Sequence, residues 1–301
     1  MNVDVLVPWP QVADRMGGWP DGVSVGVYDG DGEPPADLSA VRFYVLPYAK
    51  GAARDLIPEM PALEAVQSLS AGVEKLLPLV PPDVVLCNGR GLHDASVAEH
   101  VLGLVLAAQR DIPLWARSRT WAPHHTRSLA GSRVVLVGYG SIGEAVEDRL
   151  RPFEVDVVRV ARRARPAESV HGVDELPDLL PAADVVVLTL PQTPATTGLF
   201  GAAQLAALPD DALVVNVGRG GTVDTEALLA ETASGRLRAA LDVVDPEPLP
   251  DDHPLWALPN VLVTPHVAGG SATFYPRAEE LVAEQLRRFA SGRSLLNVVQ
   301  R

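Results

Sequence analysis

Three side chains that could bind anions or transfer protons lie in the C-terminal half of the sequence. Arg219, Glu247 and His266 each follow a short apolar run that is typical of a buried strand. Arginine binds carboxylates and polarises carbonyls, histidine exchanges protons near neutral pH, and a carboxylate can orient an imidazole. Each residue alone also has an ordinary structural interpretation, as an ion-pairing arginine, a loop carboxylate or a packed histidine. Because the carboxyl ends of parallel strands meet at one edge of a sheet, the three together predict one catalytic crevice.

A glycine-rich turn gives a second functional signal. Residues Gly138–Gly143 have the pattern GxGxxG, directly after the apolar run Val134–Val137 and before a helical segment. In this context the first glycine permits a tight turn, the second lets the backbone approach a pyrophosphate, and the third allows close helix packing. The amides at the helix N-terminus are then available to phosphate groups. The turn therefore predicts a dinucleotide site formed by Gly138, Gly140, Ser141, Ile142 and Gly143.

The next predicted strand indicates which dinucleotide binds. An NAD site usually has an acidic residue at the end of this strand, about twenty residues after the turn. Here Ala161 stands near that place, and Arg162 and Arg163 follow it. Arginine can pair with a 2′-phosphate that a carboxylate would repel, although a solvated basic loop is the alternative interpretation. The sequence therefore favours NADP(H) over NAD(H).

The elements that must position these residues form two α/β series. In the N-terminal part, short apolar runs alternate with helical patches and with loops rich in Pro and Gly, which predicts a small parallel domain. From Arg133 onward, continuous apolar runs separated by helices predict a doubly wound Rossmann-type sheet covered on both faces. The expected strands are 3–7, 41–46, 63–68, 84–86, 134–137, 155–160, 185–190, 213–217, 237–242 and 261–263.

Three helices are also expected. One runs over 96–117 and begins at a capping box formed by Ser96 and Glu99. Because it is apolar on nearly every side, we expect it to be buried between domains or in a dimer contact. The other two run over 141–150 and 276–290.

Composition and charge exclude several function classes. The 301 residues are 47% hydrophobic and 21% charged, which is typical of a globular chain with a sizeable core. A net charge of −13 argues against a nucleic-acid partner. The single cysteine, Cys87, is expected to be buried, and neither it nor the adjacent His124 and His125 predict a metal site. The N-terminus lacks the features of a signal peptide and no run is long enough to span a membrane, so we expect a cytoplasmic protein without a membrane partner.

With these motifs in this order, the chain resembles the D-isomer-specific 2-hydroxyacid dehydrogenases, and among them the glyoxylate/hydroxypyruvate reductases. The resemblance covers nearly the whole sequence. Its motifs are Ser70–Val73, Val97–Glu99, Gly138–Gly143, Leu190–Pro194, Gly218–Gly220, Glu247–Pro250 and Thr264–His266.

The resemblance implies roles for individual residues. Arg219 would bind the substrate carboxylate and polarise the 2-oxo group, His266 would be the general acid, and Glu247 would orient its imidazole. Glutamate at position 247 argues against a formate dehydrogenase, which has glutamine there. Backbone amides at Ser70, Ala71 and Gly72 would hold the carboxylate. Further cofactor contacts are implied for Pro191, Thr196, Val217, Asp242 and Gly269.

The resemblance also implies an architecture and an activity. A smaller flavodoxin-like substrate domain would comprise residues 1–98 and 275–301, and the Rossmann domain residues 99–274. The expected activity is NADP(H)-dependent reduction of a small 2-oxoacid such as glyoxylate or hydroxypyruvate by a homodimer. The alternatives are a dinucleotide-sensing binding protein of the same fold, like the C-terminal-binding-protein corepressors, or a phosphite dehydrogenase. The sequence does not identify the residues that line the distal part of the substrate pocket.

Overall fold

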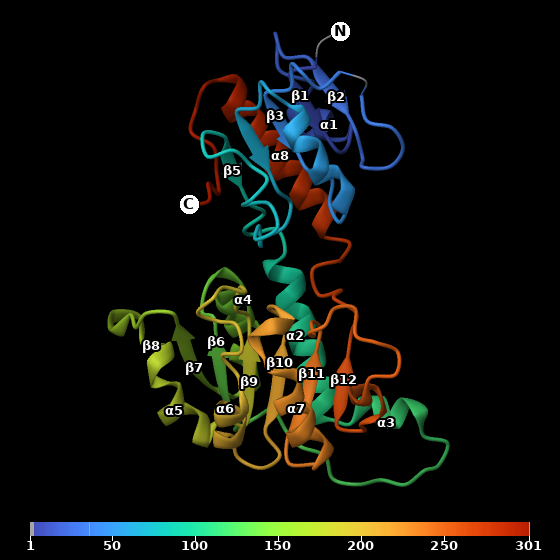
Figure 1. Ribbon diagram of the computed structural model, residues 1–301. Coiled ribbons are helices and arrows are strands. Elements are labelled where there is room, and N and C mark those ends of the chain that lie inside the picture. Colours follow the sequence, from blue (N-terminus) through green and yellow to red (C-terminus); the bar gives the residue numbers. More distant parts are fainter. Residues whose placement is uncertain (1–2, 36, 301) are drawn as a thin grey trace. The chain divides into compact units, whose positions relative to one another are not determined.

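The chain folds into two compact units (Figure 1). The computed structural model describes residues 3–35 and 37–300. Unit 1 comprises Met1–His93 and Ala272–Arg301, and unit 2 comprises Asp94–Ser271. The boundaries expected from the sequence were 98/99 and 274/275. Residues 1, 2, 36 and 301, which belong to the predicted substrate domain, lie outside the described residues.

Unit 1 is built on a five-stranded parallel sheet with the order β2-β1-β3-β4-β5. This order is that of flavodoxin-like folds, so the predicted class of the smaller domain is confirmed. The strands are β1 (Val5–Val7), β2 (Val25–Val27), β3 (Phe43–Val45), β4 (Ala65–Gln67) and β5 (Val85–Cys87). The helices are α1 (Val12–Met16), the 3₁₀ helix η1 (Gly51–Glu59) and α8 (Phe274–Ala290).

Alternating side chains of this sheet enter two separate cores. Phe43 and Val45 pack with residues of α1 and α8, whereas Tyr44 between them packs with residues of η1 and of the 73–84 segment. The alternation follows from the two-residue period of a strand. Helix α8 therefore belongs to unit 1 although it lies about two hundred residues after β5 in the chain.

Unit 2 has a seven-stranded sheet with the order β12-β11-β10-β9-β6-β7-β8, and all its strand pairs are parallel. The chain reverses direction across the sheet between β6 and β9, as in Rossmann folds, which confirms the predicted class of the larger domain. The strands are β6 (Arg133–Val137), β7 (Asp156–Ala161), β8 (Val170–Gly172), β9 (Val185–Leu188), β10 (Leu213–Asn216), β11 (Arg238–Leu241) and β12 (Val261–Val263). The α-helices are α2 (Asp94–Gln109), α3 (Ile112–Arg117), α4 (Ser141–Leu150), α5 (Leu176–Leu179), α6 (Ala202–Ala207) and α7 (Thr225–Ala233).

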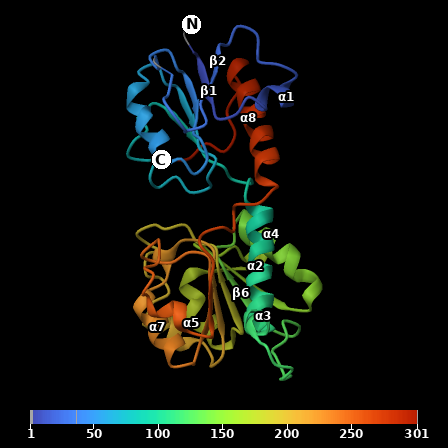
Figure 2. The ribbon, with the colours of Figure 1, turned by 90° about the vertical axis from the view of Figure 1, so that its right-hand side faces the viewer.

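Helices cover both faces of this sheet (Figure 2). Val134 and Leu136 of β6 pack with α2 and α4, whereas Val135 and Val137 enter the core on the other face with α5, α6 and α7. Strands buried on both faces must be apolar throughout, which explains their continuous apolar runs. Because all seven strands are parallel, their carboxyl ends lie at one edge of the sheet.

The helix expected over 96–117 is divided in the structure. Helix α2 ends at Gln109, and α3 begins at Ile112 after Asp111, whose φ is 50°. Pro113 explains the break, because it lacks an N–H and its ring would clash with the carbonyl of Gln109 in a continuous helix. Proline is instead tolerated in the first turn of α3.

One further prediction about local structure is wrong, and two short strands were not expected. Helix α2 begins at Asp94, so Ser96 lies inside its first turn and is not the N-cap of a capping box. The short strands β2 and β8 were not predicted, since each has three residues around a glycine or histidine and lies at a sheet edge. Cys87 is buried as predicted, and burial raises the pKa of its thiol to about 11.

Candidate active site

Arg219 lies in a loop whose shape depends on glycine. Strand β10 ends at Asn216, whose buried side chain accepts from the Gly218 amide at 3.1 Å and donates to the Arg219 carbonyl at 3.0 Å. A Cβ atom on Gly220 would lie 1.8 Å from the carbonyl oxygen of Val244, so only glycine permits this approach. The Arg219 guanidinium donates to the Gly218 carbonyl at 2.8 Å. This loop places the arginine at the carboxyl end of β10.

Glu247 and His266 form a hydrogen-bonded pair beyond the ends of β11 and β12. Nδ1 of His266 lies 2.5 Å from Oε1 of Glu247. An ionised carboxylate only accepts hydrogen bonds, so Nδ1 carries a proton and Nε2 is left for a ligand. The His266 side chain is 48% exposed and the Glu247 side chain is 41% exposed, so a ligand could reach them. The pair has the geometry of an acid–base histidine oriented by a carboxylate.

Asp242 is buried and binds the His266 loop, which comprises residues 264–268 after β12. Its side chain is 1% exposed. One carboxylate oxygen accepts from the Val267 amide at 2.9 Å, and the other accepts from the Ala268 amide at 2.9 Å. Both carboxylate oxygens of Asp242 thus accept hydrogen bonds from the loop. The predicted contact between Asp242 and a nicotinamide carboxamide stays a prediction.

The glycine turn between β6 and α4 has a shape that depends on two of its glycines. Gly138 has a φ of 106°, and a Cβ there would lie 2.9 Å from the backbone carbonyl carbon of Thr189. A Cβ on Gly143 would lie 3.1 Å from the Gly138 carbonyl oxygen, so this glycine lets α4 pack against the turn. The Cβ position of Gly140 meets nothing within 4 Å, and Gly140 supplies no side-chain cap to α4. Because the first amides of a helix have no partner within it, Ser141–Ile142 and the open space fit a pyrophosphate.

Three arginines follow β7. Ala161 ends the strand, and Arg162 and Arg163 after it are exposed, with no ion pair recorded for either in the described part of the chain. Arg165 turns toward the glycine turn instead, and its Nη2 donates to the Tyr139 carbonyl at 3.2 Å. The spacing of these arginines in the sequence does not predict that Arg165 is the one that contacts the turn.

A buried carboxylate links α4 to β7 beneath this segment. Glu147 accepts from the Tyr139 hydroxyl at 2.5 Å and pairs with the Arg159 guanidinium. Burial opposes ionisation of Glu147, but the hydrogen bonds from Arg159 and Tyr139 outweigh burial and lower its pKa. Burial and the bond to Glu147 raise the pKa of Tyr139 to about 12. The network fixes the second residue of the glycine turn relative to β7.

The other residues predicted to contact the cofactor also lie after strands of unit 2. The Thr196 hydroxyl donates to the Pro191 carbonyl at 2.6 Å and closes a short loop after β9. Val217 is buried directly after β10, and its amide donates to the Leu188 carbonyl at 3.1 Å. Gly269 follows the His266 loop and is half-buried.

The predicted carboxylate loop, Ser70–Gly72, belongs to unit 1. It follows β4, and the Ser70 carbonyl accepts from the Gly89 amide at 2.8 Å. The side chain of Asn88 donates to the Ala71 carbonyl at 3.0 Å. The loop is therefore held by its carbonyls, and within residues 3–35 and 37–300 the amides of Ala71 and Gly72 have no recorded acceptor. Such amides are suited to an anion.

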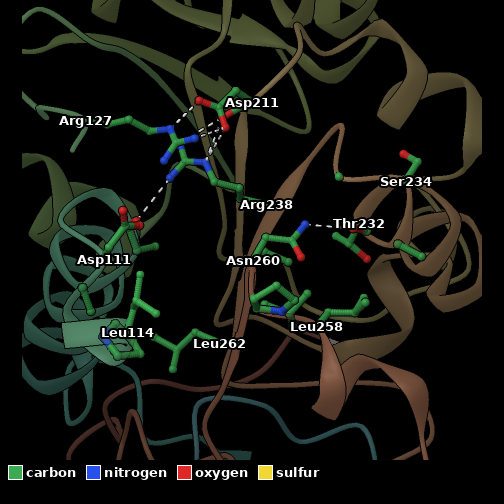
Figure 3. A pocket seen from close by; sticks show the side chains of 18 residues that line it. Asp111, Leu114, Arg127, Asp211, Thr232, Ser234, Arg238, Leu258, Asn260 and Leu262 are labelled. Carbon is green, nitrogen blue, oxygen red and sulfur yellow. Dashed lines mark hydrogen bonds and ion pairs between the residues drawn. The ribbon is translucent and has the colours of Figure 1, made fainter. Parts of the chain in front are cut away.

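A cavity of about 460 Å³ lies at the opposite edge of the unit 2 sheet (Figure 3). Part of its polar lining comes from the amino ends of strands, where Arg238 begins β11 and Asn260 precedes β12. These groups bind one another: Arg127 pairs with Asp211, Arg238 donates to the Asp211 carbonyl at 3.0 Å, and Asn260 donates to the Thr232 carbonyl at 2.8 Å. Burial and the nearby Arg127 lower the pKa of Arg238. The cavity is therefore not part of the candidate site.

The described residues contain neither a metal-binding cluster nor a membrane-spanning helix. No group of three or more His, Cys, Asp or Glu side chains in residues 3–35 and 37–300 is arranged to hold a metal ion. Over the same residues, no helix has both the length and the apolar character needed to cross a bilayer.

Comparison with known proteins gives consistent results. The family model described as "D-isomer specific 2-hydroxyacid dehydrogenase, NAD binding domain" matches residues 102–268. A glyoxylate/hydroxypyruvate reductase B of Citrobacter koseri is 38% identical over 238 residues, which cover 74% of this chain and 72% of the relative. A D-3-phosphoglycerate dehydrogenase of Methanocaldococcus jannaschii is 31% identical over 262 residues, which cover 82% of this chain but only 49% of that longer protein.

A solved structure is similar over the whole chain. The D-isomer specific 2-hydroxyacid dehydrogenase from Xanthobacter autotrophicus Py2, in complex with NADPH and MES, aligns with a TM-score of 0.81 and 33% sequence identity. The alignment covers 100% of this chain and 98% of that one.

Proposed function

Because the chain belongs to the D-isomer-specific 2-hydroxyacid dehydrogenases, a family of NAD(P)-dependent oxidoreductases, we propose that it reduces small 2-oxoacids to D-2-hydroxyacids with NADPH. The observation that carries the proposal is the Glu247–His266 pair. It lies at the same edge of the sheet as the glycine turn, so an acid–base group and a dinucleotide site share one edge.

The side chains of this edge can supply the polar part of the reaction. The bound nicotinamide supplies the hydride. The Arg219 guanidinium binds the substrate carboxylate and stabilises the negative charge that develops on the 2-oxo oxygen. His266 gives its Nε2 proton to that oxygen, and Glu247 stabilises the imidazolium that precedes the transfer. In the reverse direction, the same nitrogen takes the proton from the hydroxyl group.

The preference for NADPH rests on the end of β7. Ala161 stands where an acidic residue would bind a ribose 2′-hydroxyl, and the exposed Arg162 and Arg163 are available to a 2′-phosphate. The relative from Xanthobacter autotrophicus was crystallised with NADPH, which supports the same preference.

A panel of 2-oxoacids tests the proposed function. Glyoxylate, hydroxypyruvate, pyruvate and 3-phosphohydroxypyruvate are each assayed with NADPH and with NADH by the absorbance of the reduced nicotinamide. We expect the highest kcat/KM with NADPH and a small unphosphorylated 2-oxoacid, and a product of D configuration from pyruvate or hydroxypyruvate. If only 3-phosphohydroxypyruvate is reduced, the phosphoglycerate dehydrogenase relatives are the better guide to substrate.

The variant His266→Ala tests the assigned proton donor. Loss of general acid catalysis should lower kcat by about 10²- to 10⁴-fold. The dissociation constant for NADPH, measured by calorimetry, should stay within about twofold because the glycine turn is untouched. Full turnover in this variant would remove His266 from the mechanism. NADPH binding with no turnover of any 2-oxoacid by the wild-type protein would favour the dinucleotide-sensing alternative, and phosphite-dependent reduction of NADP would favour the phosphite dehydrogenase.

A further inference from the structure

The loop that carries His266 is fastened at several points to one buried residue. The carboxylate of Asp242 accepts from the Thr264 hydroxyl at 2.6 Å and from the amides of Val267 and Ala268, each at 2.9 Å. The Asp242 carbonyl accepts from the His266 amide at 2.8 Å. A single residue thus holds the loop on both sides of the histidine.

His266 needs this support because of its backbone conformation. Its φ is 53°, in the left-handed region that residues with a side chain seldom adopt. Such a conformation persists only where surrounding contacts impose it. The imidazole that meets Glu247 is therefore positioned through Asp242, although Asp242 touches neither ring nitrogen of His266 in the described structure.

A second histidine contacts this network from α2. Nε2 of His100 lies 3.0 Å from the Thr264 hydroxyl oxygen and 3.4 Å from Oδ1 of Asp242. The His100 side chain is 25% exposed, so it forms the outer end of the network. No local pattern of the sequence predicts this contact, because His100 and Thr264 are 164 positions apart in the chain.

Counting protons fixes the direction of these bonds. A threonine hydroxyl has one proton and can accept further hydrogen bonds. The Thr264 proton goes to the carboxylate of Asp242, since an ionised carboxylate only accepts. Thr264 must therefore accept from His100, and Nε2 of His100 must carry a proton. The chain of donors runs from His100 to Thr264 to Asp242.

We propose that His100 is a positioning residue of the reductase, which donates its Nε2 proton to Thr264 and thereby holds the His266 loop through Asp242. The effect on turnover rests on the proposed function, whereas the direction of the hydrogen bonds does not. Without the His100 donor, the Thr264 hydroxyl is no longer held from α2, and the hydrogen bond that it donates to Asp242 at 2.6 Å is less well aligned. His266 then spends less time aligned for proton transfer, and the glycine turn after β6 is unaffected.

Replacement by leucine and by glutamine separates hydrogen bonding from packing. His100→Leu keeps a side chain of similar size but removes the donor, whereas His100→Gln can place an amide N–H where Nε2 was. We expect His100→Leu to lower kcat by about tenfold to a hundredfold, with KM for NADPH changed by less than about twofold. His100→Gln should recover most of the rate. Glu99→Gln is the matched control, since Glu99 is the neighbouring α2 residue, is 65% exposed and pairs only with Arg149 in the described structure.

A double-variant cycle tests the path through Thr264. Thr264→Val removes the hydroxyl while keeping the shape of the side chain. If the donor chain is right, the double variant His100→Leu/Thr264→Val should have the kcat of Thr264→Val alone, because the two changes break the same connection. Independent, multiplying losses would contradict the proposal, and so would wild-type kcat in His100→Leu or equal defects in the leucine and glutamine variants.

A spectroscopic measurement decides the hydrogen-bond direction without any substrate. The wild-type protein is labelled with ¹⁵N at its seven histidines, and the His100 signals are identified by their loss in His100→Gln. We expect the neutral His100 ring to carry its proton on Nε2. A proton on Nδ1 instead would overturn the proposal even if the enzyme reduces every 2-oxoacid tested. If no 2-oxoacid is reduced, the proposed function fails while the Nε2 proton can still be observed, so the two failures are distinguishable.

Discussion

At the scale of single residues, the chemistry of the candidate site depends on which atoms are already bound. Nδ1 of His266 is occupied by Glu247, so the opposite nitrogen is the one available to substrate. The Asp242 carboxylate is occupied by the loop that carries His266, so its contribution is positional. Arg162 and Arg163 are the reverse case, because both remain exposed after folding. Exposed guanidinium groups near a glycine turn are suited to bind a negatively charged ligand group such as a phosphate.

The pair of exposed arginines gives a prediction about cofactor choice. Arg162→Ala/Arg163→Ala should raise KM for NADPH by about tenfold or more, because each lost charged hydrogen bond to a phosphate costs about 1.5–3 kcal/mol. KM for NADH should change by less than about twofold, since NADH lacks the 2′-phosphate. Steady-state kinetics with both cofactors measure the two changes. Arg151→Gln, another exposed arginine of unit 2, is the control. Equal losses for NADPH and NADH would show that these arginines do not contact the 2′-phosphate.

Local patterns predict the glycine turn well because its six residues are consecutive in the sequence. Gly138 needs a positive φ, and Gly143 packs within a few residues of it, so the motif contains its own explanation. The His100–Thr264 contact could not be predicted in this way, because it joins an α2 residue to the end of β12. The Glu247–His266 contact was expected only through the family resemblance, since no local pattern brings two residues nineteen positions apart into contact.

At the scale of elements, the strands of unit 2 were more predictable from the sequence than the limits of its helices. Runs buried on both faces are apolar throughout, and β10 and β12 were expected within one residue of their observed ends. The apolar composition of residues 96–117 predicts one continuous helix, whereas Pro113 causes a break between α2 and α3. Proline acts through one carbonyl of the preceding turn, so a single residue outweighs the pattern of its neighbours.

The loop between β10 and α7 should tolerate no side chain at Gly220. In Gly220→Ala the new Cβ would lie 1.8 Å from the Val244 carbonyl oxygen, so one backbone segment must move. We expect a loss of about 2–4 kcal/mol in the free energy of unfolding, measured in urea, and a fall in kcat because Arg219 moves with the loop. Gly103→Ala is the control, because its Cβ meets nothing within 4 Å and α2 should gain about 0.5–1 kcal/mol from alanine. Equal stability of the two variants would mean that the loops at Gly220 adjust freely.

The link between α4 and β7 should depend on pH. The pKa of Glu147 in the folded protein is lowered from its ordinary value of 4.5, so its charge stabilises the fold above that value. This stabilisation is lost as the pH falls through the lower, folded value. Glu147→Gln should therefore cost about 1–2 kcal/mol at pH 7 and progressively less below pH 4.5, by urea unfolding at each pH. Asp148→Asn, at an exposed ion pair of the same helix, should cost less than about 0.5 kcal/mol at either pH. A cost for Glu147→Gln that is constant with pH would contradict the argument.

At the scale of the whole molecule, exposed apolar side chains of unit 2 point to self-association. Ile112 and Leu114 of α3 are 52% and 55% exposed, and Trp121 shortly after them is 98% exposed. A contiguous group of large exposed apolar side chains is typical of a contact with another protein. We therefore predict that α3 and Trp121 take part in the homodimer contact that is expected from the sequence.

That surface can be tested by introducing charge into it. We expect the wild-type protein to elute as a dimer in size-exclusion chromatography with light scattering, and Ile112→Glu/Leu114→Glu to elute as a monomer, because each interface would then bury four unpaired carboxylates. Each chain carries a net charge of −13, so added salt should strengthen the wild-type association by screening repulsion between the copies. Leu77→Glu is the matched control, since Leu77 is 43% exposed and belongs to unit 1. A dimer that survives the α3 changes, or one lost equally in the Leu77 variant, would place the contact elsewhere.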